Sequence, residues 1–203
     1  MTAPSPRQDH RLAFLRGFLK RPKEVGSVIP SSRFLEKRIV KSADLAHARL
    51  VVELGPGTGG TTRALLARMR RDARLLAIEI NPHFVKLLRS SADPRLVVHE
   101  GSATDIEGAL AAHDLERPEV ILSGIPFSTM ERQLGLDILC SVRDSLAPDG
   151  RFVAYQFRDR VEILGRDVFG RARVQTEVLN IPPMRVYRWD KPETQPAVHE
   201  ARA

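Results

Sequence analysis

The chain has 203 residues, with 32 Lys or Arg against 25 Asp or Glu, which gives a formal net charge of +7. A hydrophobic fraction of 42% can fill the core of one domain, and the positive balance favours anionic partners such as nucleic acid, phosphate-rich ligands or an acidic membrane surface. Cys140 is the only cysteine, which excludes an internal disulfide, and no apolar run is long enough to predict a membrane-spanning helix. Residues 1–22 lack the continuous apolar core of a secretory signal.

The N-terminal region combines large apolar residues with basic ones. If residues 9–20 form a helix, its apolar stripe comprises Leu12, Phe14, Leu15, Phe18 and Leu19. The charged residues Asp9, Arg16 and Lys20 lie opposite. Such a helix either packs its apolar side on the domain or lies in an anionic membrane interface. A second basic, apolar segment spans 157–174 and supports the membrane interpretation.

Between these regions, apolar runs that predict buried strands alternate with segments of helical period. In chain order, we expect strands at 49–54, 74–80, 95–100, 118–124 and 151–157, and helices at 59–70, 81–91, 106–114 and 129–146. The helix at 81–91 begins with Asn81 as its N-cap and Pro82 at its first position. This alternation implies a parallel sheet with helices on both faces.

The C-terminal part departs from this alternation. Two strand-like runs, 172–180 and 184–189, are joined by Ile181-Pro182-Pro183, which leaves no room for a helix. The two runs should therefore be antiparallel. A reversed strand near the edge of an otherwise parallel sheet resembles the class I methyltransferases. We therefore expect their α/β, Rossmann-like fold, with seven mostly parallel strands and one antiparallel strand near the C-terminus.

A glycine-rich loop follows the first predicted strand. Gly55, Gly57 and Gly60 satisfy the G-x-G-x-x-G pattern of dinucleotide sites. Gly55, Gly57 and Gly59 equally satisfy G-x-G-x-G, and with the preceding Glu53 this sequence resembles the loop that binds S-adenosylmethionine (AdoMet). A tight turn without any ligand is the third interpretation.

An acidic residue, Glu79, ends the second strand about 20 residues beyond this loop. A carboxylate there can accept hydrogen bonds from both ribose hydroxyls of either cofactor. Three features favour AdoMet over NAD: the long segment ahead of the first strand, the two-strand ending, and the sequence ELGPGTG.

The methyltransferase family that ELGPGTG resembles supplies further expectations for the cofactor. The resemblance implies that Glu53 lies near the methionine amine and that Gly55 and Gly57 pass under the methionyl and ribose parts. It also implies that the pair after the third strand, Ser102 and Ala103, faces the adenine, although many relatives have Asp in place of Ser102. The predicted cofactor site is completed by Thr58, Gly59, Ile80 and Ser123.

The fourth predicted strand ends in the sequence Ser123-Gly124-Ile125-Pro126-Phe127. It aligns with the Asn-Pro-Pro-Tyr type of motif that amine methylases of this class carry, with Gly124 in place of the Asn. Because methyl transfer is a displacement that depends on positioning, a proline-fixed turn with outward carbonyls could hold the amine. Phe127 could then offer a cation–π face to it. The alternative is a plain strand-ending turn with a buried Phe.

Two further polar residues are candidates for orienting the amine or relaying its proton: Tyr155, which ends the fifth strand, and Asn180, which ends the next one. Either could equally be a packing or surface residue. The histidines are scattered without the spacing of metal ligands, so we expect no metal.

The combination of FLKRPKEVGSVIPSSRFL, VVELGPGTGGTTRALL, AIEINPHF, SGIPFST, FVAYQF and LNIPPMRVYRW resembles the bacterial phospholipid N-methyltransferases that are related to the rRNA adenine dimethylases. The resemblance covers about residues 14–190. It implies AdoMet-dependent, successive methylation of phosphatidylethanolamine to phosphatidylcholine by a cytoplasmic enzyme bound peripherally to the inner face of the plasma membrane.

The resemblance also implies a domain organisation. Residues 1–45 would form a basic amphipathic helical segment that contacts the anionic membrane and covers the active site, with Ser31 and Ser32 near the methionine end of the cofactor. Residues 46–190 would form the methyltransferase domain, and residues 191–203 a disordered tail.

Three rival functions stay open on the sequence. Ornithine-lipid methylases look similar, so the head group is less fixed than the reaction. An rRNA adenine dimethylase suits the +7 charge, but it would need an Asn at Gly124 and a helical RNA-binding domain after the sheet. The third rival is a membrane protein that binds AdoMet without turnover. We expect a monomer with a phospholipid substrate and no nucleic-acid partner.

Overall fold

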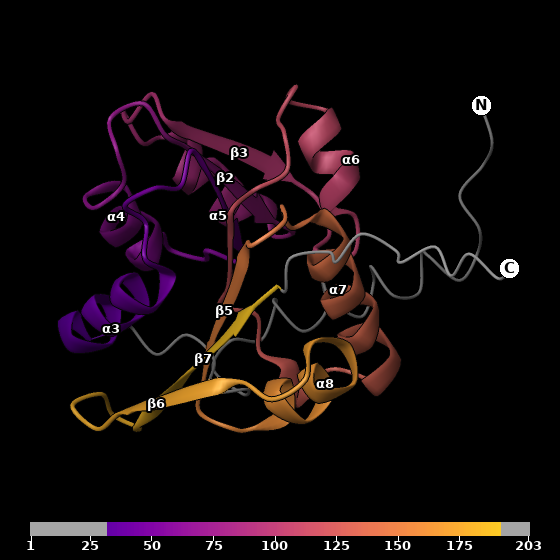
Figure 1. Cartoon of the computed structure of the whole chain (residues 1–203). Coiled ribbons are helices and arrows are strands. Elements are labelled where there is room, and N and C mark those ends of the chain that lie inside the picture. The colour runs from indigo at the N-terminus through magenta and orange to yellow at the C-terminus, as the bar shows by residue number, and fades with distance from the viewer. Residues whose placement is uncertain (1–31, 192–203) are drawn as a thin grey trace, which may run out of the picture.

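A computed structural model describes residues 32–191, which form one seven-stranded sheet between two layers of helices (Figure 1). The strands are β1 (Leu50–Leu54), β2 (Arg74–Glu79), β3 (Leu96–Glu100), β4 (Val120–Ser123), β5 (Arg151–Gln156), β6 (Arg173–Glu177) and β7 (Met184–Asp190), in the spatial order β3-β2-β1-β4-β5-β7-β6. β1 to β5 pair in parallel, and β7 runs antiparallel to both β5 and β6. The predicted fold class, with its reversed strand near the C-terminus, is confirmed.

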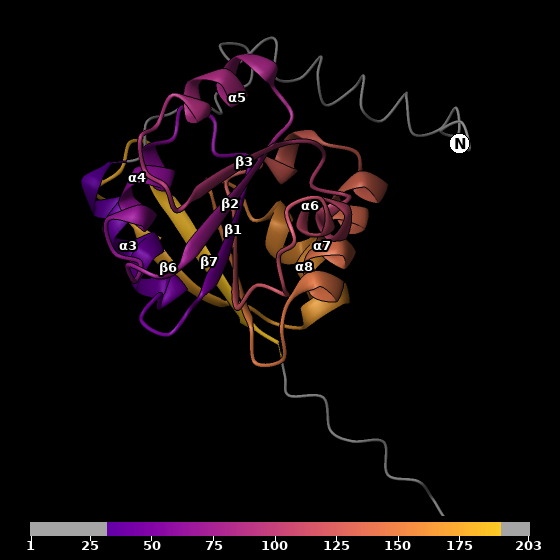
Figure 2. The same cartoon turned by 90° about the horizontal axis from the view of Figure 1, so that it is seen from above.

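The helices connect the strands along both faces of the sheet. They are α3 (Arg33–Ala43), α4 (Gly60–Leu66), α5 (Pro82–Arg89), α6 (Ile106–Ala111), the 3₁₀ turn η1 (Phe127–Thr129), α7 (Arg132–Ser145) and α8 (Arg160–Phe169). α3 and α4 cover one face, and α6, α7 and α8 cover the other (Figure 2). Successive residues of β1 follow this division, since Val51 packs into one apolar cluster and Val52 into the other.

The strand order reverses between β1 and β4. The chain winds from β1 through β2 to β3, then crosses back and builds β4 and β5 on the other side of β1. In open α/β sheets, ligands bind outside the carboxyl ends of the strands at such a reversal. This edge therefore brings together the segments that follow Leu54, Glu79, Ser123 and Gln156.

Helix α3 is part of this packing. Leu35, Ile39 and Ala43 are buried along one side of the helix, and Ser32 caps it through an Oγ that accepts a hydrogen bond from the Leu35 amide. Residues 33–43, which the sequence assigned to the N-terminal segment, thus pack on the sheet. The predicted helix at 9–20, Ser31 and the predicted tail beyond Lys191 lie outside the described residues. Within residues 32–191, no helix has both the length and the apolar character needed to cross a bilayer.

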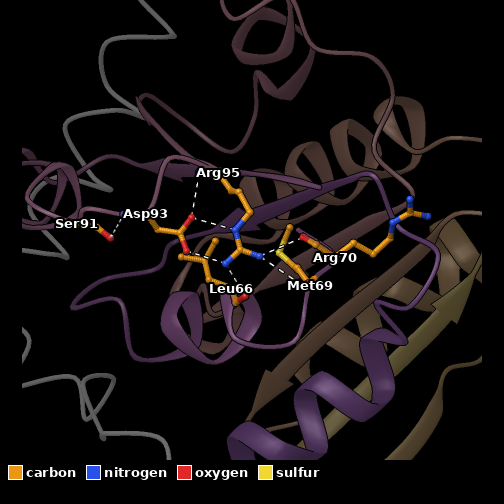
Figure 3. Close-up of polar contacts among 6 residues, drawn as sticks. All are labelled: Leu66, Met69, Arg70, Ser91, Asp93 and Arg95. Atoms are coloured by element: carbon orange, nitrogen blue, oxygen red, sulfur yellow. Dashed lines mark hydrogen bonds and ion pairs between the residues drawn. The ribbon is translucent and has the colours of Figure 1, made fainter. Parts of the chain in front are cut away.

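One predicted helix ends earlier than expected, and an arginine binds the carbonyl of its last residue and two carbonyls that follow it. We expected a helix over 59–70, but α4 ends at Leu66 and the chain turns beneath it. Arg95 Nη2 donates to the Leu66 carbonyl at 2.8 Å, and Nη1 donates to those of Arg70 at 3.1 Å and Met69 at 3.4 Å (Figure 3). Asp93 holds the guanidinium from the other side, with one carboxylate oxygen 3.0 Å from Nε and the other 2.7 Å from Nη2.

We expect Arg95→Met to lower the free energy of unfolding by about 2 kcal/mol, because it leaves several carbonyls without their charged donor. Chemical denaturation measures this change. Arg71→Met, on the same connection but exposed, is the matched control and should change stability by less than about 0.5 kcal/mol. Equal effects from the two substitutions would contradict the capping role of Arg95.

Candidate active site

The glycine loop after β1 touches the turn after β4. Gly55 has a φ of 68°, and a Cβ built on it would stand 2.9 Å from Cγ1 of Ile125. Gly57 also has a positive φ, of 56°, but its Cβ position has no atom within 4 Å. The loop is therefore closed against the β4 turn at Gly55 and open at Gly57, where a ligand can approach the backbone.

Glu79 braces the open part of the loop from the end of β2. The side chain is 2% exposed, and its two oxygens accept hydrogen bonds from the Gly57 amide at 3.0 Å and the Asn81 amide at 2.8 Å. Burial raises the pKa of this carboxyl, while these amides oppose the rise. Because each carboxylate oxygen can accept a second hydrogen bond, Glu79 can still bind the hydroxyls of a ribose.

Glu53, at the end of β1, is fully buried and only half satisfied. Its Oε2 accepts a hydrogen bond from the Thr62 hydroxyl at 2.6 Å, whereas Oε1 has no hydrogen-bond partner. Burial raises the pKa of Glu53 to about 7, the nearby Glu79 adds to the rise, and the Thr62 bond opposes it. A buried carboxylate with a free acceptor oxygen suits a cationic ligand group such as an amino-acid ammonium.

The turn after β4 is held by hydrogen bonds on several sides. The Gly124 amide donates to the Leu54 carbonyl at 3.1 Å, and the Ser123 Oγ accepts from the Ile125 amide at 3.2 Å. The buried Gln156 amide donates to the Ile125 carbonyl, which also accepts from the Phe127 amide at 3.0 Å. The Ile125 carbonyl, which we expected to face the amine, thus has two partners inside the protein.

Phe127 lies in the hydrophobic core, with 0% of its surface exposed. The sequence left open whether this ring faces an amine or is simply buried. The described position is the buried one, and the ring packs within the apolar core. Its cation–π function stays a prediction.

Tyr155 occupies the space beside Gly124. A Cβ at Gly124 would stand 2.5 Å from the Tyr155 hydroxyl and 3.3 Å from the Gly55 carbonyl oxygen. The Tyr155 hydroxyl also lies 3.2 Å from the Thr61 Oγ1 on α4. The two predicted residues Gly124 and Tyr155 are therefore one unit, because only glycine leaves room for the hydroxyl.

The predicted adenine pair follows β3 in a tight turn. The Ser102 Oγ lies 2.9 Å from the Thr104 Oγ1, and Ala103 is 8% exposed. Among the other predicted cofactor contacts, Thr58 is exposed and accepts a hydrogen bond at its carbonyl from Arg63, and Ile80 follows Glu79 directly. The predicted positions Glu53, Glu79, Ser102 and Ser123 all lie at or just beyond the carboxyl ends of their strands.

Asn180 and Ser32 contact each other instead of the β4 turn. The Asn180 Oδ1 accepts a hydrogen bond from the Ser32 amide at 2.9 Å, and its Nδ2 donates to the Pro182 carbonyl at 2.9 Å. These bonds give Asn180 a bracing role between α3 and the β6–β7 turn. The predicted contacts of Asn180 with the amine and of Ser32 with the cofactor stay predictions.

Sequence reasoning missed three polar residues of this edge: Thr61, Thr62 and Gln156. All are buried, and each holds one of the predicted residues in place. The sequence did carry a signal for two of them, because Thr61 and Thr62 lie in the first turn of the helix that follows the glycine loop. Within residues 32–191, no cluster of three or more His, Cys, Asp and Glu side chains could hold a metal ion.

Comparison with known proteins places this geometry in a family. Residues 19–119 match the family model described as ribosomal RNA adenine dimethylase. The ornithine lipid N-methyltransferase of Singulisphaera acidiphila is 32% identical over 177 residues, which cover 86% of this chain and 92% of that protein. This chain belongs to the same family of methyltransferases as this lipid N-methyltransferase. Ribosomal RNA small subunit methyltransferase A of Caulobacter vibrioides is 37% identical, but over only 45% of this chain and 34% of that protein.

Solved structures agree on the fold. The S-adenosyl-L-homocysteine complex of an RNA methyltransferase from Salinibacter ruber superposes with a TM-score of 0.58 at 21% identity, covering 83% of this chain and 97% of that one. The 1,6-didemethyltoxoflavin-N1-methyltransferase of Burkholderia thailandensis gives a TM-score of 0.65 at 17% identity, covering 95% and 93%. The predicted AdoMet-dependent methyltransferase is thereby confirmed at the level of fold and cofactor.

The residues at this edge fit AdoMet. The open backbone at Gly57 admits a ligand, the Glu79 carboxylate can bind ribose hydroxyls, and the unpaired Glu53 oxygen can accept from the methionine ammonium. NAD, the alternative that the glycine spacing left open, carries no such ammonium.

We expect Glu53→Gln to make the ligand-free protein more stable than the wild type above about pH 7 and nearly equal to it below about pH 4, where the carboxyl is protonated in both the folded and the unfolded protein. A carboxyl whose pKa is raised by folding contributes most stability at low pH and loses it as the pH rises through the folded pKa of about 7. The gap between the two proteins should therefore widen, by on the order of 3 kcal/mol, as the pH rises.

Thermal unfolding across this pH range measures the effect, with the exposed Glu107→Gln as the matched control. A gap between wild type and Glu53→Gln that does not change with pH would show that Glu53 has an ordinary pKa.

The contact between Gly124 and Tyr155 predicts a coupling between two substitutions. Gly124→Ala should destabilise the protein by about 1–3 kcal/mol, because the new Cβ overlaps the Tyr155 hydroxyl. The same change made in a Tyr155→Phe background should cost clearly less, since that background lacks the overlapping oxygen. A double-mutant cycle by chemical denaturation measures the coupling, and strictly additive effects would contradict it.

Proposed function

We propose that this protein transfers methyl groups from AdoMet to the primary amine of a membrane lipid. The observation that carries the proposal is the share of this chain that each relative matches. The relative named for a lipid substrate matches 86% of this chain, whereas the RNA methyltransferases of Caulobacter vibrioides and Thermotoga neapolitana match 45% and 52%. The RNA methyltransferases thus share about half of this chain, whereas the lipid relative shares nearly all of it, which supports an acceptor of the lipid kind.

The β4 turn supports a lipid amine over an adenine base. An adenine dimethylase of this class would use an Asn side chain where this chain has Gly124. The Tyr155 hydroxyl lies 2.5 Å from where a Cβ would begin, so a side chain at this position would have to displace the hydroxyl. The phenolic hydroxyl of Tyr155 thus stands where the Asn amide would be. A single hydroxyl suits an alkylamine better than it suits an adenine, which presents both a donor and an acceptor.

In this proposal the protein contributes binding and orientation. When bound, AdoMet supplies the electrophilic methyl group that the amine nitrogen displaces from sulfur. Burial raises the pKa of Tyr155 above its usual range, with the Glu53 charge adding to the rise, so the hydroxyl stays protonated at neutral pH. Tyr155 therefore orients the neutral amine through a hydrogen bond and does not act as its base.

Two head groups fit the proposed acceptor. Phosphatidylethanolamine, the substrate that the sequence resemblance predicts, and ornithine lipid, the substrate in the name of the relative, both present a primary ammonium. We propose phosphatidylethanolamine methylation, successive to phosphatidylcholine, with ornithine lipid as the second candidate. Either substrate would require the enzyme to work peripherally at a membrane, which we propose is the cytoplasmic face of the plasma membrane.

In the decisive experiment, the purified protein is incubated with AdoMet that carries a labelled methyl group and with each of three acceptors: phosphatidylethanolamine vesicles, ornithine-lipid vesicles and small ribosomal subunits. Thin-layer chromatography and RNA extraction then locate the label. We expect label in lipid, with the position of the spots giving the head group and the number of methyl groups. Label confined to RNA would overturn the proposal.

Glu79→Ala should remove lipid methylation and AdoMet binding together, with affinity falling by about 100-fold, because two charge-assisted hydrogen bonds to the cofactor are lost. Calorimetry measures the affinity, and the exposed Glu116→Ala is the control. Full activity in Glu79→Ala would show that the cofactor site lies elsewhere.

A further inference from the structure

The turn between β6 and β7, residues 178–183, is built with its apolar side chains outward. Val178 is 68% exposed, Leu179 59% and Ile181 89%. The polar Asn180 between them is 2% exposed. A surface turn ordinarily has the reverse arrangement, with polar groups outward and apolar groups inward. We call these six residues the hairpin tip.

Buried polar groups hold the hairpin tip in this inverted form. Asn180 binds the Ser32 amide and the Pro182 carbonyl. Glu177, which is 4% exposed, accepts a hydrogen bond from the Leu179 amide at 2.9 Å and forms an ion pair with Arg38 at 2.8 Å. The aliphatic side chains are therefore exposed on a braced turn, beside α3 (Figure 1).

The hairpin tip lies at the edge of the sheet that carries the active site. β6 runs in the same direction as β5, because both are antiparallel to β7, so β6 ends at the same edge. In the register of the sheet, Gln156 pairs with Arg185, and Glu177 pairs with Met184. Gln156 also donates a hydrogen bond to the Ile125 carbonyl. The end of the hairpin tip, just before Met184, therefore lies one strand away from the residue that holds the turn after β4.

Other exposed apolar side chains gather at the same edge. Phe157, 53% exposed, directly follows Gln156, and Phe34, 37% exposed, lies in the first turn of α3 beside Ser32. Within residues 32–191, this edge thus carries five of the eight exposed large hydrophobic side chains. Exposed apolar side chains gathered at one edge of the molecule mark an interaction surface.

The charge of the surrounding segments indicates the partner. The segments around Phe34, Phe157 and Met184 carry the basic residues Arg33, Lys37, Arg158, Arg160 and Arg185, against the acidic Glu36 and Asp159, and Arg185 lies 3.9 Å from Asp159. The Arg33 guanidinium lies 5.0 Å from the centre of the Phe34 ring, which places a cation directly over an exposed apolar group. Aliphatic and aromatic groups interleaved with arginine suit the interface of an anionic bilayer, where apolar groups enter the acyl region and cations stay with the phosphates.

We propose that the hairpin tip inserts into the anionic lipid surface and sets the active-site edge against the membrane. This inference rests on the proposed lipid substrate for its purpose, but its physical content is binding to a bilayer. The tip would act as a rigid wedge that fixes the orientation of the pocket, so that a head group enters beside Gly124 without leaving the membrane.

The test compares two double variants with the same residue types changed. Val178→Ser with Leu179→Ser alters the tip, and Val174→Ser with Leu87→Ser alters a Val and a Leu of 47% and 45% exposure elsewhere. The full chain is sedimented with vesicles of phosphatidylglycerol and phosphatidylcholine, which contain no primary amine. We expect the tip variant to bind about tenfold more weakly than the wild type, and the control variant to bind within about twofold of it.

A second measurement separates this inference from the proposed function. A short-chain phosphatidylethanolamine, used below its micelle concentration, reaches the pocket without a membrane. The tip variant should methylate it at the wild-type rate and lose activity only on vesicles. If the wild type does not methylate the short-chain lipid, phosphatidylethanolamine fails as the proposed substrate, while the vesicle result still decides whether the tip binds the membrane. The inference is overturned if the tip variant sediments with vesicles as strongly as the wild type. It is also overturned if the control variant loses as much vesicle binding as the tip variant.

Discussion

The candidate cofactor site depends on two buried glutamates near the carboxyl ends of the adjacent parallel strands β1 and β2. Glu53 ends β1 with one oxygen unpaired, and Glu79 ends β2 with both oxygens bound to backbone amides. Burial raises the free energy of the charged form of both carboxyls, and the nearby Glu79 adds to this for Glu53. Two buried carboxyls are costly in the ligand-free protein. They suit a ligand that brings a cationic group to one carboxylate and hydroxyls to the other.

The sequence predicted the parts of the molecule that follow from local chemistry. Apolar runs such as those ending in Leu54 and Ser123 predicted the strands, and the two strand-like runs at 172–180 and 184–189, with no room for a helix between them, predicted the reversed β7. Glycine spacing together with Glu79 predicted the cofactor loop. These features could be read because each depends on residues that are close in the sequence, or on a spacing that every such unit shares.

What the sequence did not reveal depends on contacts between distant segments. Gly124 could be recognised as a missing Asn, but only the fold shows that the hydroxyl of Tyr155, from the next strand, occupies the space. Asn180 was predicted to end a strand, but β6 ends at Glu177, and Asn180 lies in the turn that follows, where it bonds with Ser32 and Pro182. The outward apolar groups of the hairpin tip are likewise invisible in a sequence that simply reads as β-strand.

The central claim is that Glu53 is a buried carboxyl awaiting the ammonium of the cofactor. Carbon-13 NMR of the glutamate carboxyl groups, with Glu53→Gln to assign the resonance, measures its pKa in the protein with and without S-adenosylhomocysteine, which carries the same ammonium. The account predicts a pKa of about 7 in the free protein and a fall of at least about one unit on binding. A Glu53 pKa that is the same in the two states would contradict it.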